Sequence, residues 1–416
     1  MASTSSPLRL RANPDARRIV RARGLRALVD GLVAVILPGY LLAKGFSTVQ
    51  VGAVITATLL GSAAVTLFVG TRGGGFPRRL LLQIMAIAMV LTGLGFATVG
   101  PFAALLVVAA LGTVNPSSGD VSGFLPIEQA LLPDTVSPTN RTAVFARYSL
   151  IASLAGAFGA LAAGGPGLVA RHTVVTVHQA ERAAFVVYAA VGVVLLLQYR
   201  HLRVGARLPE DQPPSRLGPS RSVVYRLAGV FSVDALGGGF AVQSILVLWL
   251  SLRFDLSTAV SGAVFFWSGL LSASSALLAP RLARRIGLIR TMVFTHLPAN
   301  FLLMAAALMP NAGLAVACLL ARSLLSQMDV PARTSYVMAI VRPEERAAAA
   351  SVTNVPRSLA ASLPPLAAGW MLAHSSFGWP LLLAGGLKVI YDLSLLALFH
   401  DIRPEEERTQ RSARSK

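Results

Sequence analysis

The sequence predicts an all-α membrane protein with about twelve transmembrane helices arranged in two six-helix halves. Of its 416 residues, 54% are hydrophobic and only 13% are charged, whereas soluble domains carry roughly 25% charged residues. About twelve apolar stretches approach the ~20 residues that a helix needs to cross a bilayer. The two parts of the chain also repeat each other in parallel, and many secondary transporters are built from such repeats.

The repeat is visible in three places. Residues 153–164 (SLAGAFGALAAG) return 205 positions later as residues 358–369 (SLAASLPPLAAG). Residues 47–53 (STVQVGA) return 210 positions later as residues 257–263 (STAVSGA), and Asp30 returns 204 positions later as Asp234. Because the offsets are similar and keep the same order, they indicate two homologous halves.

The apolar stretches define the order of the elements. The predicted spans are 25–43, 49–70, 79–99, 102–124, 142–164, 183–202, 223–250, 257–279, 288–309, 313–338, 347–372 and 378–399. A polar, proline-rich stretch separates spans six and seven and predicts a linker. The predicted organisation is therefore a basic N-terminal tail (1–24), a bundle (25–202), the linker (203–222), a second bundle (223–399) and a C-terminal tail (400–416).

The distribution of positive charge predicts the orientation. A net charge of +19 first suggests a nucleic-acid partner, but the positions of the charges oppose this. Of the 37 Lys and Arg residues, 28 fall on the side that holds both chain ends, four on the other side and five within spans. By the positive-inside rule both termini are cytoplasmic. The Ala- and Arg-rich composition favours a bacterial cytoplasmic membrane, and we expect no nucleic-acid partner.

Six plus six spans, a basic middle loop and cytoplasmic termini resemble the major facilitator superfamily. That superfamily carries a Gly- and Arg-rich motif between helices two and three, repeated between helices eight and nine. The corresponding residues here are 70–79 (GTRGGGFPRR) and 279–290 (APRLARRIGLIR), both without the motif's aspartate. The resemblance implies a transporter that works by alternating access between two rocking halves.

The tenth span carries the densest group of charges. A charge at bilayer depth costs about 2.5–3.5 kcal/mol, so each requires a reason. On a continuous helix Arg322, Asp329 and Arg333 share one stripe. We interpret the stripe as a wall of the substrate cavity, with a structural ion pair between helices as the alternative. Further cavity candidates are Arg357, Tyr336, Asn354 and Gln243.

Four aspartates are candidates for proton coupling, because a carboxyl group in a low-dielectric site exchanges a proton near neutral pH. Asp120 in the fourth span matches Asp329 in the repeat, and Asp30 matches Asp234. The alternative for the second pair is a helix-end aspartate that forms an ion pair with Arg26 or Arg226.

Other charges predict local contacts. Glu128 is expected to pair with Arg141 or Arg147 at the cytoplasmic mouth. Lys388 and Asp392 are four positions apart and predict a pair within the last helix. Four residues are candidates for a cytoplasmic gate: Glu128, Arg147, Arg284 and Arg290.

The sequence contains no phosphate-binding loop, Cys/His cluster or hydrolase elbow. We therefore expect no enzyme activity, metal or cofactor, with a proton gradient as the energy source. The predicted function is proton-coupled export of a small organic molecule by a monomer in the lipid bilayer, and the buried arginines favour an anionic substrate. The alternatives are a proton-coupled importer of a sugar or carboxylate, and a receptor or assembly protein that transports nothing.

Overall fold

The computed structural model describes residues 13–72, 75–117, 122–137, 140–205, 217–342 and 345–399. Apart from short 3₁₀ turns, its elements are α-helices. In the first half they are α1 (Pro14–Ala43), α2 (Thr48–Arg72), α3 (Arg78–Thr98), α4 (Phe102–Leu111), α5 (Phe124–Leu131), α6 (Arg141–Ala162), α7 (Gly165–His172) and α8 (Val177–Arg200). In the second half they are α9 (Arg221–Phe240), α10 (Gln243–Phe254), α11 (Thr258–Ile286), α12 (Leu288–Leu308), α13 (Ala312–Ser323), α14 (Asp329–Ile340), α15 (Arg346–Ser362), α16 (Pro364–His374) and α17 (Trp379–Phe399).

The predicted fold class is confirmed. Nine helical stretches among the described residues are long and apolar enough to cross a membrane. Two shorter apolar helices, α4 and α13, open the predicted fourth and tenth spans, while α15 and α16 together occupy the eleventh. Several crossings are therefore made of two helices in sequence, which is tolerated in a membrane where the freed backbone groups face protein or a wet cavity.

Three boundaries differ from the prediction. The first helix begins at Pro14 rather than at residue 25, because the Asn13 side chain caps the backbone N–H of Asp15 and proline suits the first turn. The fourth span continues through α5 to Leu131 instead of ending at residue 124. The tenth span is broken between Ser323 and Asp329, so its charges do not lie on one continuous helix.

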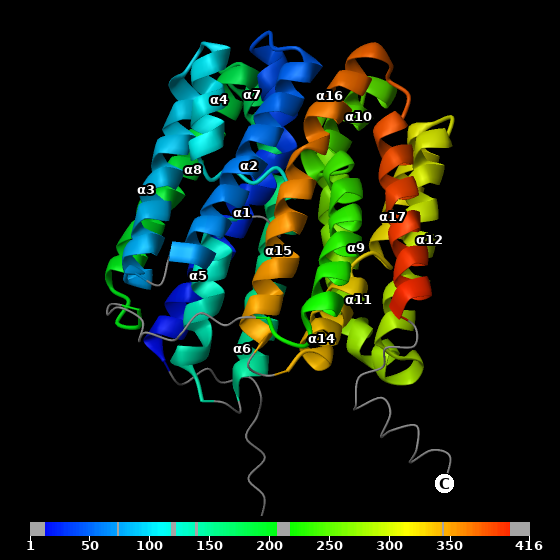
Figure 1. Cartoon of the computed structure of the whole chain (residues 1–416). Helices are drawn as coiled ribbons and strands as arrows, with labels where there is room; N and C mark the ends of the chain where they lie inside the picture. Colours follow the sequence, from blue (N-terminus) through cyan, green and yellow to red (C-terminus); the bar gives the residue numbers. More distant parts are fainter. Residues whose placement is uncertain are drawn as a thin grey trace, which may run out of the picture.

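The two halves stand side by side as bundles of roughly parallel helices (Figure 1). We call the end at which α1 begins and α17 ends the terminal end, and the opposite end, where α7, α10 and α16 lie, the outer end (Figure 1). The linker joins α8 to α9 at the terminal end, because α8 finishes and α9 starts there.

At the outer end the halves are in close contact through small residues. Gly52 of α2 faces Gly369 and the carbonyl oxygen of Pro365 in α16, and Gly262 of α11 faces the Ala160 carbonyl in α6. A side chain at either glycine would collide with backbone. Small residues let membrane helices approach closely, so these positions hold the outer end closed.

Hydrogen bonds add to this closure. The Ser244 hydroxyl group of α10 donates to the carbonyl oxygen of Ala34 in α1 at 2.7 Å. The backbone N–H of Leu366 in α16 donates to the Thr56 hydroxyl of α2 at 3.0 Å. At the terminal end the main contacts of α5 are with α2 and α3, and those of α14 are with α11, α12 and α15, all within their own half. The structure is thus a state closed at the outer end.

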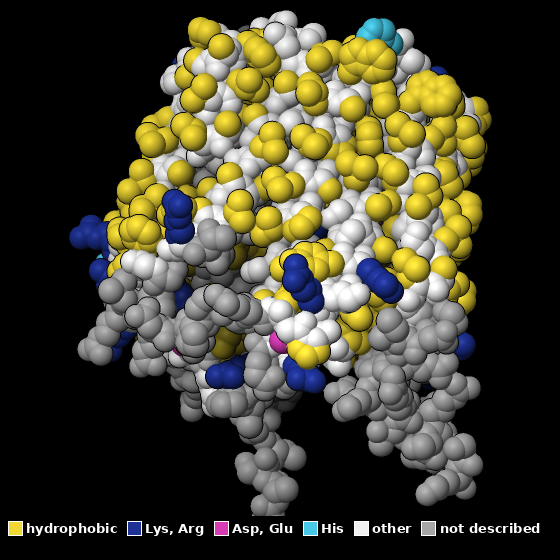
Figure 2. Space-filling view, in the orientation of Figure 1, with side chains coloured by type: hydrophobic (Ala, Val, Ile, Leu, Met, Phe, Trp, Pro, Cys, Tyr) yellow, Lys and Arg dark blue, Asp and Glu magenta, His cyan; other side chains and the backbone are white. Residues whose placement is uncertain are grey.

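The surface has the polarity expected of a protein in a bilayer. Hydrophobic side chains cover the upper and middle parts of the face in Figure 2, while Lys and Arg gather toward the terminal end. Many large apolar side chains are exposed on the membrane-crossing helices, among them Leu91, Trp267 and Ile390. In water such a surface would favour aggregation, but in a membrane it faces lipid.

The closure at the outer end generates a testable prediction. Gly52→Leu should force α2 away from α16 and populate a state open at the outer end. Spin labels at Ser47 and His374, in a Cys318→Ala background, should report a longer distance distribution than in the parent. Gly386→Leu is the matched control, because a Cβ at Gly386 meets no atom within 4 Å. An unchanged distance in Gly52→Leu would contradict the proposed role of this contact.

Candidate functional site

Each half contains a group of buried charges. The first, which we call the N-half cluster, joins α1, α5, α6 and α8. Arg26 forms a bidentate ion pair with Glu128, with N–O distances of 3.0 and 2.7 Å. The Tyr148 and Tyr199 hydroxyl groups donate to the same carboxylate at 2.5 and 2.6 Å. Since Arg26 and Glu128 are at most 1% exposed, the cluster is a buried ion pair rather than a surface bridge, with Arg26 Nε left without a partner among the described residues.

Asp30 lies one helical turn from Arg26 but outside this ion pair. It is 2% exposed, and its Oδ1 atom has no hydrogen-bond partner among the described residues. Tyr188 lies beside its carboxyl group, and the Tyr188 hydroxyl donates to the carbonyl oxygen of Thr113 at 2.8 Å. Arg26 and Arg23 are within electrostatic range of Asp30, but none of the ion pairs between described residues includes its carboxyl group.

The second group, the C-half cluster, is centred on Asp234 of α9. Lys388 of α17 donates to one carboxylate oxygen at 2.6 Å, and Arg333 of α14 donates to the other at 3.0 Å. The His296 Nε2 atom of α12 lies 3.8 Å from the Lys388-bound oxygen. Three helices thus converge on one carboxylate of a fourth, and all four side chains are less than a tenth exposed.

Two further aspartates extend the C-half cluster. Asp392 accepts from Asn300 at 2.9 Å and lies 3.0 Å from His296 Nδ1. Asp329 lies 3.6 Å from Arg333. The sequence predicted this contact, because the two residues are four positions apart. His296 therefore bridges two carboxylates, Asp234 and Asp392, through its two ring nitrogens, and its charge depends on whether both nitrogens carry a proton.

The clusters occupy corresponding places with opposite polarity. In the N-half a cation on the first helix pairs with an anion at the end of the fourth span. In the C-half the anion is on the first helix, Asp234, and the cation is on the fourth span, Arg333. Asp30 and Asp234 match in the repeat, yet Asp234 has two close cations and Asp30 has none among the described residues.

Two of the predicted cavity residues, Arg322 and Arg357, lie near the C-half cluster. Arg322 is within electrostatic range of Asp234 and Asp329, and Arg357 is within that of Asp234. Among the predicted cavity residues, the buried Arg322 Nε and Gln243 Nε2 atoms have no hydrogen-bond partner in the described part of the chain, as is also the case for several buried donor atoms elsewhere. Both lie near interruptions of a helix: Arg322 is in the last turn of α13, and Gln243 begins α10.

The remaining candidate residues range from fully buried to exposed. Tyr336 is fully buried in α14, and Asn354 is exposed on α15. Arg147 is half-buried on α6, while Arg284 and Arg290 are exposed near the junction of α11 and α12. Asp120 lies outside the described residues.

Several observed ion pairs differ from those that the sequence predicted. Glu128 is held by Arg26, 102 positions away, rather than by its predicted neighbours. Lys388 and Asp392 do not pair with each other, because Lys388 donates to Asp234 and Asp392 contacts His296 and Asn300. Asp234 pairs with Arg333 and Lys388 rather than with Arg226. Local spacing could not reveal these partners, since each lies on a helix distant in sequence.

Cations are concentrated around Asp234. Among the described residues, Lys388 and Arg333 pair with its carboxylate, and Arg322 and Arg357 are within electrostatic range of it. Guanidinium groups bind carboxylate and phosphate through charge-assisted hydrogen bonds, so the arrangement contains donors suited to a negatively charged ligand.

Comparisons with known proteins agree with this architecture. The family model described as Major Facilitator Superfamily matches residues 22–363. An uncharacterized membrane protein of Saccharomyces cerevisiae, YJR124C, is 26% identical over 430 residues, covering 93% of this chain and 94% of that protein.

Solved structures are similar in fold over nearly the whole chain. A bacterial homolog of the human lysosomal transporter Spinster, inward-facing and unoccupied, matches with a TM-score of 0.67 and 14% identity over 93% of this chain and 97% of that one. The nucleoside transporter NupG gives 0.68 and 14%, over 93% and 99%. An inward-facing bacterial homologue of ferroportin gives 0.69 and 14%, over 92% and 98%.

The N-half cluster predicts strong coupling in stability. Arg26→Met or Glu128→Leu alone leaves the partner charge buried, and each should lower the free energy of unfolding by about 3–5 kcal/mol. The double variant should lose clearly less than the sum of the two, because no unpaired charge remains. Thermal or denaturant unfolding in detergent measures the three values. Strictly additive losses would show that the pair does not act as a unit.

Proposed function

The chain belongs to the major facilitator superfamily, a family of transporters, and we propose that it exports a small organic anion in exchange for protons. In this proposal it works by alternating access as a monomer in a bacterial cytoplasmic membrane, with both termini in the cytoplasm. Asp30 carries the proton, and the C-half cluster together with Arg322 and Gln243 receives the anion.

The observation that carries proton coupling is the contrast between Asp30 and Asp234. Asp234 is held ionised by Lys388 and Arg333, which makes it a poor carrier unless the substrate displaces those partners. Asp30 is equally buried but belongs to none of the ion pairs between described residues, and Arg26 and Arg23 act on it only from electrostatic range. An unpaired carboxylate in a low-dielectric interior is costly, so such a group takes up or releases a proton as its surroundings change.

One observation supports an anionic substrate: Arg322 Nε and Gln243 Nε2 are buried donors without a protein acceptor among the described residues. Guanidinium groups bind carboxylate and phosphate through charge-assisted hydrogen bonds. An anion that reached these donors would also compete with Asp234 for Arg333, which links substrate binding to the cluster that ties the C-half helices together.

The direction is proposed from the charge pattern, because in a state closed at the outer end both exporters and importers exchange substrate with the terminal side. Lys and Arg gather at that end (Figure 2), and a positive rim raises the local concentration of anions. Since we expect the terminal end to be cytoplasmic, loading from that side corresponds to export.

The proton role is tested with Asp30→Asn. In vesicles containing purified protein and a transported anion, a pH gradient should drive accumulation by the wild type but not by Asp30→Asn. Exchange of labelled for unlabelled anion without a gradient should persist in the variant, because substrate binding and rocking remain. Asp134→Asn is the matched control, since Asp134 is exposed and bridges Arg78 at the surface. Gradient-driven accumulation that survives in Asp30→Asn would remove this residue from the mechanism.

The substrate and direction are tested by growth of an efflux-deficient bacterium across a panel of toxic organic anions and uncharged analogues. Wild type should increase tolerance to some anions, and Arg322→Gln at equal membrane expression should reduce that tolerance. Greater sensitivity to one compound would instead indicate import, the alternative of a sugar or carboxylate symporter. Tolerance unchanged by the protein, together with no flux in vesicles, would favour a receptor or assembly protein.

A further inference from the structure

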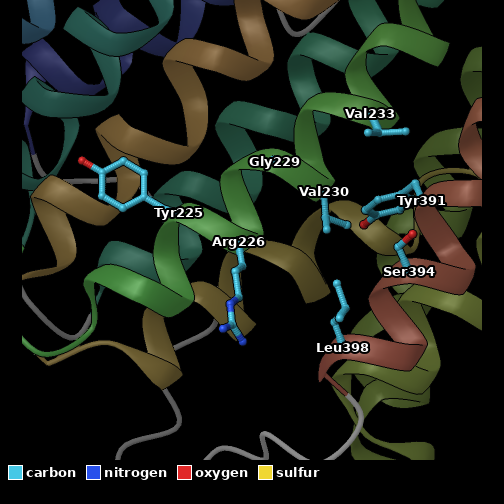
Figure 3. Close-up of a pocket in the computed structure, with 8 residues that line it drawn as sticks. All are labelled: Tyr225, Arg226, Gly229, Val230, Val233, Tyr391, Ser394 and Leu398. Atoms are coloured by element: carbon cyan, nitrogen blue, oxygen red, sulfur yellow. The ribbon is translucent and has the colours of Figure 1, made fainter.

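A groove lies between α9 and α17 on the membrane-exposed side of the second half, apart from the proposed substrate route. It has a volume of about 250 Å³ and is lined by Tyr225, Arg226, Gly229, Val230, Val233, Tyr391, Ser394 and Leu398. Figure 3 shows α9 contributing its first turns and α17 its last turns to the walls. Because α9 begins and α17 ends at the terminal end, the groove opens in the membrane leaflet on that side.

The groove exists partly because Gly229 has no side chain. A Cβ atom at this position would meet no other atom within 4 Å, so the glycine is not required for close helix packing. Val230, Val233 and Leu398 make the walls mostly apolar. Small-molecule sites commonly have volumes of roughly 300–1,000 Å³, so this groove fits part of an elongated apolar molecule rather than a whole large ligand.

Two polar groups in the groove lack partners. The Tyr391 side chain is fully buried, and its hydroxyl group has no hydrogen-bond partner among the described residues. Leaving a buried hydroxyl unsatisfied costs about 1–3 kcal/mol, and an acceptor from outside the chain would relieve this cost once α9 and α17 move slightly apart. Arg226 is exposed at the terminal side of the groove (Figure 3) and forms no hydrogen bond or ion pair within the described ranges.

We propose that this groove binds an anionic phospholipid of the leaflet at the terminal end, with its phosphate on Arg226 and one acyl chain along Val230 and Val233. As α9 and α17 separate slightly to admit the lipid, an ester oxygen accepts from Tyr391. Charge complementarity selects the occupant: basic pockets between membrane helices on the cytoplasmic side bind anionic headgroups. The neighbouring surface is exposed and apolar at Tyr225, Leu393 and Leu398, as it is where lipid chains lie against a protein.

The site reaches the C-half cluster through Tyr391. The Tyr391 ring packs edge-on against His296 with centroids 5.7 Å apart and against Phe231 at 6.3 Å. Phe231 in turn lies under the Arg333 guanidinium at 5.6 Å. A lipid bound to the hydroxyl of Tyr391 would therefore hold the helix that carries Lys388 and Asp392 in place.

Lipid binding to the purified protein tests the proposal without any transport assay, so it stands or falls separately from the proposed function. Native mass spectrometry in detergent should show more retention of phosphatidylglycerol than of phosphatidylethanolamine. Arg226→Ala should weaken phosphatidylglycerol binding about fivefold, the effect of one basic residue near a membrane surface. Arg285 is an exposed arginine in the last turn of α11, at the terminal end of the molecule. Arg285→Ala should leave phosphatidylglycerol binding unchanged. Equal losses in both variants would indicate unspecific attraction and overturn the site.

Two further variants test the groove itself. Gly229→Leu should fill it and abolish preferential retention of phosphatidylglycerol, while size-exclusion profiles confirm that the protein is folded. Tyr391→Phe should raise the melting temperature of lipid-free protein, because it removes an unsatisfied buried hydroxyl. Added phosphatidylglycerol should then stabilise the wild type more than this variant. Unchanged binding in Gly229→Leu, or equal lipid stabilisation of wild type and Tyr391→Phe, would overturn the proposal.

Discussion

The interior of this molecule depends on the rule that a charge buried in a membrane protein needs a counter-charge. In each half the first helix and the fourth span meet through such a pair, Arg26 with Glu128 and Asp234 with Arg333. Because both members of each pair are almost fully buried, neither could leave without exposing the other to a low-dielectric interior. The pairs therefore fix helices that lipid alone would not hold together, since no hydrophobic effect drives helix association in a bilayer.

The two halves use this rule differently, and the difference suggests how they divide the work. In the N-half pair, two tyrosine hydroxyl groups donate to the Glu128 carboxylate beside Arg26, and Asp30 is a separate carboxyl group. The C-half pair is shared among Lys388, Arg333 and a histidine that bridges to Asp392. The Arg26–Glu128 pair is a rigid support, because its partners are fixed. The Asp234 carboxylate is shared among several cations, so one partner can be exchanged for another. In the proposed mechanism the N-half handles the proton and the C-half responds to the anion.

The contacts between the two halves differ from the ion pairs within each half. They consist of small residues and a few hydrogen bonds at the outer end, such as Gly52 against Gly369 and Ser244 to Ala34. No ion pair between the halves occurs among the described residues. Small-residue contacts separate without leaving a charge unpaired, so the energetic cost of opening is low compared with that of breaking either cluster. The charges thus keep each half intact while the interface between them is free to rearrange.

The sequence by itself determined the membrane class, the two-fold repeat, the order of the spans and the pairing of Asp329 with Arg333, because these depend on composition, offset and helical spacing. It also pointed to Asp30 and Asp234 as equivalent positions. Only the tertiary structure decided that Glu128 belongs to Arg26 and that Lys388 and Asp392 reach different partners, because those contacts join helices that no local pattern relates. The structure also showed where the tenth span is broken, between Ser323 and Asp329, whereas the helical projection of the sequence treated it as one continuous helix.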